Sequence, residues 1–136
     1  MENAAGLPAE LSLLGWSVLL LLVHITVQAV AVTRETGRDY NVGPRDEPHA
    51  ARRPLTGRAE RALRNFLETY PAFIGLALAL AVSGEAGGAG AVGAHVWFWS
   101  RVVYLPLYLA GIPYFRSLVW TVSVAGPLVM LFALFT

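Results

Sequence analysis

A stripe of polar residues lies near the middle of this chain, at spacings that favour one face of a helix. It consists of Arg61, Arg64, Asn65 and Glu68. Residues three and four apart are neighbours on an α-helix, so these four side chains share one face. A guanidinium binds a carboxylate through paired hydrogen bonds. A carboxylate such as that of Glu68 would instead accept from an ammonium or amide group of a ligand.

Two later segments carry polar groups with related spacing. The first contains Arg101, Tyr104 and Tyr108, again three and four residues apart. The second begins with Arg116 and Ser117. Together with the stripe at 61–68, these groups outline a polar cleft with four arginines and one glutamate. The ligand that suits such a cationic cleft is a small polar anion with at least one free carboxylate.

The elements that must position these residues are membrane helices. The chain has 136 residues, of which 56% are hydrophobic and only 14% are charged, and it contains no cysteine. Apolar segments run over 11–32, 66–83, 91–112 and 117–136, and about 20 helical residues span a bilayer. We therefore expect an all-α integral membrane protein, a single domain over 1–136 with four transmembrane helices at about 9–34, 58–83, 91–112 and 115–135. This composition excludes soluble and disordered classes.

The arginines of the first loop predict the orientation of the chain. Cytoplasmic loops carry an excess of basic residues. The loop after the first span contains Arg34, Arg38, Arg45, Arg52, Arg53 and Arg58. The glycine-rich loop over 84–90 has only one charge, that of Glu85. We therefore expect a multi-pass protein with loop 34–57 in the cytoplasm, both termini outside and the cleft open to the cytoplasm.

Each of these polar groups could instead have a purely structural role. Arg64 and Glu68 could form an ion pair within one helix, and Arg58 and Arg61 could be interfacial anchors whose stems lie along apolar surface. The tyrosines and Trp120 could belong to an interfacial aromatic belt, and His24 could be a hydrogen-bonded packing residue. Four arginines on three helices are hard to explain by packing, because each charge in the membrane costs at least ~2.5 kcal/mol.

The second helix carries a motif that resembles a known family. The segment Arg61-Ala-Leu-Arg-Asn-Phe-Leu-Glu-Thr-Tyr-Pro71 is similar to the signature R-A-x-R-N-x-x-E of the MAPEG family, the membrane-associated proteins in eicosanoid and glutathione metabolism. The segment over 101–108 and the pair Arg116-Ser117 resemble the third and fourth helices of that family. The resemblance covers the whole chain, which is most similar to the short bacterial branch of the family.

The resemblance implies a homotrimer that binds glutathione at each subunit interface. The resemblance implies that the glutathione-binding positions are Arg61, Arg64, Asn65, Glu68, Arg101 and Tyr108. We add Tyr104 to these expected binding residues because it belongs to the same polar cleft. Arg116, with Ser117 beside it, matches the arginine that stabilises the glutathione thiolate. Trp120 stands where prostaglandin-forming relatives have a tyrosine, and Asp46 lies in the loop where that branch has an aspartate proposed to assist.

The expected function is that of a glutathione-dependent enzyme of the bacterial inner membrane. It would conjugate glutathione, its co-substrate, to lipophilic electrophiles or reduce lipid hydroperoxides. No pair of histidines has the spacing of metal ligands. A net charge of +1 gives no reason to expect binding to nucleic acid. Two alternatives remain open: a non-catalytic binding or scaffold protein of the same fold, and a small transporter or proton relay that uses Glu68 and His24.

Overall fold

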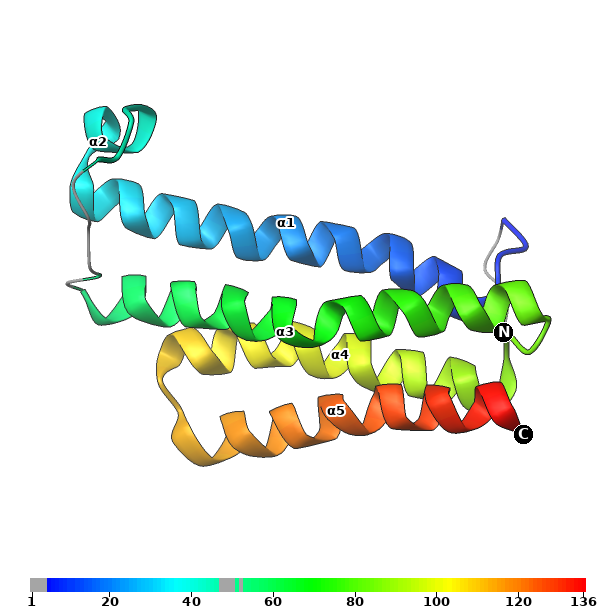
Figure 1. Cartoon of the computed structure of the whole chain (residues 1–136). Helices are drawn as coiled ribbons and strands as arrows, with labels where there is room; N and C mark the ends of the chain where they lie inside the picture. Colours follow the sequence, from blue (N-terminus) through cyan, green and yellow to red (C-terminus); the bar gives the residue numbers. More distant parts are fainter. Residues whose placement is uncertain (1–4, 47–50, 52) are drawn as a thin grey trace.

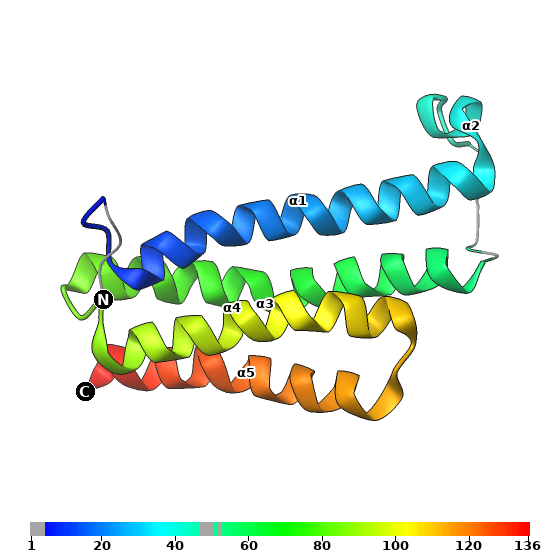
Figure 2. The same ribbon diagram turned by 180° about the vertical axis from the view of Figure 1, so that it is seen from behind.

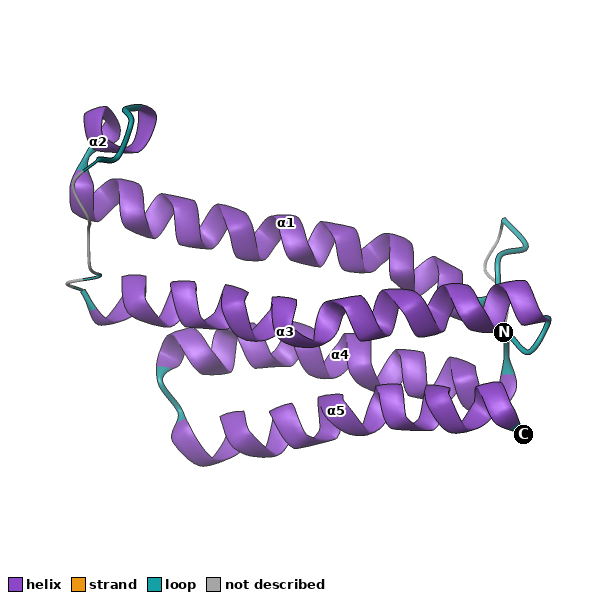
Figure 3. Ribbon diagram, in the orientation of Figure 1, coloured by secondary structure: helices purple, strands orange, loops and turns teal. Residues whose placement is uncertain are grey.

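The chain folds entirely into helices in the part of it that the structure describes. The computed structural model describes residues 5–46, 51 and 53–136 (Figure 1). Its five helices are α1 (Ala9–Thr36), α2 (Arg38–Val42), α3 (Pro54–Ser83), α4 (Gly88–Ala110) and α5 (Pro113–Phe135). Short loops join them, with no strand among the described residues (Figure 3). Arg52, one of the basic residues expected in the first loop, lies outside the described residues.

Four long helices lie side by side and α2 stands apart at one end. Both views show α1 along α3 and α4 along α5 (Figures 1 and 2). The beginning of α1 and the end of α5 lie at the same end of the bundle (Figure 1). The opposite end, which we call the α2 end, carries α2, the start of α3 and the short α4–α5 turn (Figure 1).

Three of the long helices, α1, α3 and α5, are long and apolar enough to cross a membrane. The sequence predicted four such spans, and α4 is the one that does not meet this criterion despite its 23 residues. Glycine, tryptophan, tyrosine and Arg101 take the place of aliphatic residues along it. Many of these side chains are buried against the other helices, so α4 needs less lipid-facing apolar surface than its neighbours.

The ends of the helices follow from local sequence. Helix α3 begins at Pro54, earlier than the expected start near Arg58, because proline at the first helical position already has a helical φ angle. The backbone N–H of Arg53 donates to the carboxylate of Glu35 and so ties the start of α3 to the end of α1. Gly84 ends α3 in the left-handed conformation, with φ of 81°, which glycine adopts without strain.

The core combines stacked aromatic rings with a close helix contact. The rings of Phe73 and Trp97 are parallel within 9° and 3.9 Å apart, and Phe66 lies 5.6 Å from Trp97. A Cβ atom added to Gly93 would lie 2.6 Å from the carbonyl oxygen of Gly126. Only glycine therefore allows α4 and α5 to approach this closely, a packing mode common between membrane helices.

Glu10 joins the start of α1 to the start of α4. Its side chain is 0% exposed, and its Oε1 atom accepts a 2.7 Å hydrogen bond from the backbone N–H of Gly87. Gly87 precedes the first residue of α4, where unpaired N–H groups and the helix dipole favour a negative charge. Glu10 therefore stabilises the packing of α1 on the loop that follows α3.

We expect Glu10→Ala to lower the free energy of unfolding by about 1.5–3 kcal/mol, the usual contribution of a hydrogen bond to a charged group. The measurement is the midpoint of thermal unfolding in detergent. Glu85→Ala is the matched control, because Glu85 is an exposed acid of the same loop. Equal midpoints for the two variants would contradict this role of Glu10.

Candidate functional site

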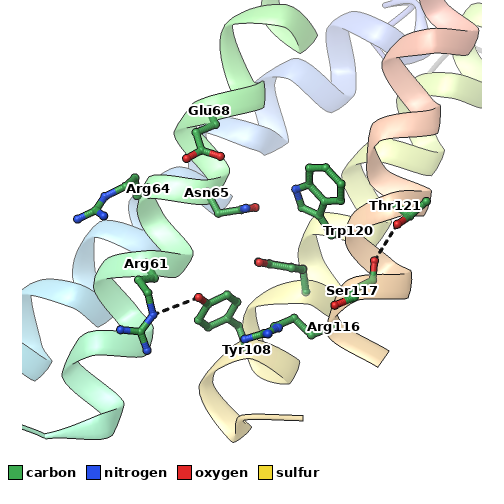
Figure 4. A pocket seen from close by; sticks show the side chains of 10 residues that line it. Arg61, Arg64, Asn65, Glu68, Tyr108, Arg116, Ser117, Trp120 and Thr121 are labelled. Atoms are coloured by element: carbon green, nitrogen blue, oxygen red, sulfur yellow. Dashed lines mark hydrogen bonds between the residues drawn. The ribbon is translucent and has the colours of Figure 1, made fainter. Parts of the chain in front are cut away.

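A cavity of about 590 Å³ opens at the α2 end of the bundle, between α3, α4 and α5 (Figure 4). A cavity of this size can hold a small ligand. It is lined by Arg61, Arg64, Asn65, Glu68, Tyr104, Tyr108, Arg116, Ser117, Trp120 and Thr121. The polar stripe of the sequence therefore forms one wall of a real cavity.

The α3 wall places separate charges along the cavity. Arg61, Arg64 and Glu68 are exposed, and Asn65 is half-buried between them. The charged groups of Arg64 and Glu68 point apart (Figure 4), and no ion pair joins these two residues among the contacts of the described chain. The carboxylate of Glu68 is therefore available for a ligand, as are the guanidinium groups.

Along the α4 wall, the rings of Tyr104 and Tyr108 lie in a row between the guanidinium groups of Arg101 and Arg116. The Cζ atom of Arg101 lies 4.6 Å from the centroid of the Tyr104 ring, and the rings of Tyr104 and Tyr108 are 5.4 Å apart. The Cζ atom of Arg116 lies 4.9 Å from the centroid of the Tyr108 ring. A cation over an aromatic face is held by the ring quadrupole. The Tyr108 ring therefore fixes Arg116 at the cavity wall although Arg116 comes from α5.

Two arginines of α3 bind the end of α4. The Nε atom of Arg61 donates to the hydroxyl oxygen of Tyr108 at 3.2 Å, and Nη1 of Arg58 donates to the carbonyl oxygen of Leu109 at 3.3 Å. The last carbonyls of a helix have no partner within it, and basic groups satisfy them. Arg58 therefore acts on the shape of the site through α4, whereas Arg61 both holds Tyr108 and lines the cavity.

The α5 wall combines polar and apolar groups. The hydroxyl of Ser117 donates to the carbonyl oxygen of Pro113 at 3.3 Å, and the hydroxyl of Thr121 donates to the carbonyl oxygen of Ser117 at 2.9 Å (Figure 4). Both hydroxyl oxygens keep free lone pairs. The indole of Trp120, 38% exposed, forms the apolar part of this wall.

The residues expected from the sequence line the cavity with one exception, and Trp120 and Thr121 line it in addition. Arg101 is 0% exposed and does not line the cavity; it reaches the cavity only through Asn65, to which it donates a hydrogen bond. Thr121 was not expected. It follows Ser117 by four residues, so the helical spacing of α5 could have identified it. Asp46 lies in the loop after α2 and is not among the lining residues.

The comparison with protein families identifies the chain. The model of the MAPEG family matches residues 13–136, nearly the whole chain. The chain belongs to the MAPEG family. No curated protein and no solved structure matches it. Membership supports a membrane protein of the glutathione and eicosanoid metabolism type, in agreement with the three apolar helices.

His24 of this MAPEG protein lies in the packed core rather than at the cavity. Its ring centroid is 4.7 Å from that of Phe66, and its Nδ1 atom is 3.1 Å from the carbonyl oxygen of Leu20. These contacts favour the packing interpretation of His24. Among the described residues, no group of three or more histidine, cysteine, aspartate and glutamate side chains could hold a metal ion.

The charges of the MAPEG cavity suit an anion that also carries one positive group. Three guanidinium groups and a single carboxylate line it, and Arg101 adds a fourth guanidinium behind the wall. Near a protein surface, such charges interact more strongly than they would in bulk solvent. The arrangement can orient a zwitterionic ligand with its ammonium toward Glu68 and its anionic groups toward the arginines.

Proposed function

We propose that this MAPEG protein binds glutathione in the cavity at the α2 end and uses its thiolate in chemistry on lipophilic molecules. The observation that carries the proposal is the unpaired carboxylate of Glu68 in the same cavity as three guanidinium groups. Glutathione has two carboxylates, one ammonium and a thiol. Its ammonium would pair with Glu68, its carboxylates with Arg61, Arg64 and the amide of Asn65, and its sulfur with Arg116.

Arg116 is the residue proposed to activate the thiol. The thiolate is the reactive form of a thiol, and a neighbouring cation lowers the thiol pKa. Arg116 is held against Tyr108 without a carboxylate partner among the described contacts, so its charge is available to the sulfur. Ser117, next to Arg116, is proposed to accept a hydrogen bond from the ligand in the same region.

Two reactions suit an activated glutathione thiolate in a membrane. In conjugation, the sulfur attacks an electrophilic carbon and the leaving group departs with its electron pair. In reduction of a lipid hydroperoxide, the sulfur attacks the terminal oxygen and the lipid alcohol leaves after taking up a proton. The resulting sulfenic acid then condenses with a second glutathione to give the disulfide and water. The apolar face of Trp120 supports a lipophilic partner in either case.

The same features support a homotrimer of four-helix transmembrane subunits. Arg61, Arg64 and Glu68 are exposed on a helix that can cross the membrane. Charges facing lipid are costly, whereas charges facing protein or a water-filled site are tolerated. A second copy of the chain would cover this face of α3, and α4 would cross the membrane inside the assembly. The arginines at the α2 end support a cytoplasmic position for it in a bacterial inner membrane, with both termini outside.

The test combines binding and turnover in detergent. We expect glutathione to raise the thermal unfolding midpoint in a concentration-dependent way, since a ligand present at about a hundredfold its Kd stabilises by about 2.7 kcal/mol. We also expect turnover of 1-chloro-2,4-dinitrobenzene. The serine analogue of glutathione, which has no thiol, is the control and should stabilise without reacting. Stabilisation without turnover of any electrophile or hydroperoxide would favour the non-catalytic scaffold, and no stabilisation would reject glutathione as the ligand.

A further inference from the structure

We propose that Arg101 is a positioning residue that orients the side-chain amide of Asn65, so that both hydrogens of its Nδ2 atom face the cavity. The identity of the ligand in this inference rests on the proposed function, whereas the contact between Arg101 and Asn65 does not depend on it. It assigns to Asn65 the chemistry of a double donor, which suits a carboxylate or carbonyl oxygen of the ligand.

Arg101 is enclosed by protein. Its side chain is 0% exposed and is absent from the cavity lining. Its Cζ atom lies 5.5 Å from the centroid of the Phe66 ring and 4.6 Å from that of Tyr104. The rings hold the guanidinium by cation–π attraction, which is strong where water is excluded. The group is therefore placed accurately enough to fix a hydrogen-bond partner.

The contact with Asn65 determines which end of the amide faces the ligand. Nη1 of Arg101 donates to Oδ1 of Asn65 at 2.9 Å. A guanidinium has donors only, so it can bind the oxygen of an amide but not its nitrogen. Asn65 lines the cavity, and its Nδ2 makes no hydrogen bond among the contacts of the described residues. Both Nδ2 hydrogens therefore remain for a ligand.

Arg101 also strengthens these donors. Its Nε and Nη2 atoms are buried and have no hydrogen-bond partner among the described residues. The carboxylate of Glu68 acts on the guanidinium electrostatically, without an ion pair between the two groups among the described contacts. Hydrogen bonds in series polarise one another, and a charged donor gives the stronger bond. A positive charge bound to Oδ1 draws electron density from the amide, which makes the N–H groups better donors to an anionic acceptor. Arg101 would thus act on the ligand through Asn65.

The first experiment reads the orientation of Asn65 without any ligand. The chain has three asparagines, so protein labelled with [15N]asparagine gives a simple spectrum in micelles, and Asn65→Ala assigns the Asn65 signals. We expect Arg101→Met to shift the Asn65 side-chain amide signals. Leu80→Ala is the control, because Leu80 is fully buried near the other end of α3; it should leave them in place. Unchanged signals in Arg101→Met would overturn the proposal.

The second experiment tests whether Arg101 acts through Asn65 on binding. We expect Asn65→Ala and Arg101→Met each to weaken glutathione binding about tenfold, and the double variant to be no weaker than Asn65→Ala. Leu80→Ala should lower the unfolding midpoint without this loss of affinity, as a purely structural change would. Additive losses in the double variant would overturn the proposal, because they would mean that Arg101 acts independently of Asn65.

These two experiments separate the contact from the ligand. If the wild-type protein does not bind glutathione, the proposed function fails, whereas the spectrum of ligand-free protein still decides whether Arg101 orients Asn65. If Arg101→Met does not fold, Arg101→Leu decides instead, since leucine also has no donor for Asn65 Oδ1. Arg101→Leu should shift the Asn65 signals in the same way, and unshifted signals would overturn the proposal.

Discussion

Replacing Arg116 with glutamine is expected to lower turnover by about a hundredfold or more while changing the affinity for glutathione by less than about threefold. Arg116 lines the cavity and is held on the ring of Tyr108, without a carboxylate to neutralise it among the described residues. Its loss removes the cation that favours the thiolate over the thiol. The contacts proposed for the peptide part of glutathione, at the α3 wall, would remain.

The measurement is the ultraviolet absorbance of the bound thiolate, followed by the rate with an electrophile. Arg53→Gln is the matched control, because Arg53 is an exposed arginine at the same end of the bundle but does not line this cavity. It should form as much thiolate as the wild type. If Arg116→Gln also forms as much thiolate as the wild type, Arg116 does not activate the thiol.

Replacing Glu68 with glutamine is expected to weaken glutathione binding by about tenfold to a hundredfold. Glu68 is the only carboxylate among the residues that line the cavity, and no arginine of the described chain forms an ion pair with it. Removing one partner of a charged hydrogen bond costs about 1.5–3 kcal/mol, which corresponds to this range. The equilibrium constant can be measured by calorimetric titration in detergent.

A change of ligand tests whether Glu68 meets the ammonium. An analogue of glutathione without its amino group should bind the wild type and Glu68→Gln with similar affinity. Glu60→Gln is the control variant, since Glu60 lies on the same helix but outside the cavity, and it should bind glutathione as the wild type does. If Glu68→Gln binds the analogue and glutathione with equal losses, Glu68 has a structural role instead.

Helical spacing was sufficient to predict most of the cavity wall. Residues three and four apart share a face wherever α3 is regular, so Arg61, Asn65 and Glu68 could be grouped before their surroundings were known. Helical spacing could not predict that Arg101 is fully buried. Arg101 and Tyr104 lie on the same face of α4, but only Tyr104 lines the cavity, because its ring covers the guanidinium of Arg101. Which of two neighbours is buried depends on the packing of other helices.

Contacts between distant parts of the chain could not be predicted from the sequence either, because they also depend on how the helices pack. Glu10 is simply an acidic residue before an apolar run until the loop at Gly87 is brought beside it, 77 residues later in the chain. Nor could composition predict how α4 differs from the other long helices. Its small residues pack closely against α5, as the contact of Gly93 with Gly126 illustrates, whereas its polar residues contact α3, as the hydrogen bond of Arg101 with Asn65 illustrates.

The central claim is that the cavity at the α2 end holds glutathione with its sulfur at Arg116. An electron cryomicroscopy structure of the protein in lipid nanodiscs with saturating glutathione tests it most directly. The account predicts a trimer with ligand density that extends from Glu68 to Arg116, with the sulfur next to the Arg116 guanidinium and an oxygen within hydrogen-bond distance of Asn65 Nδ2. An empty cavity at saturating glutathione, or glutathione bound elsewhere, would contradict it.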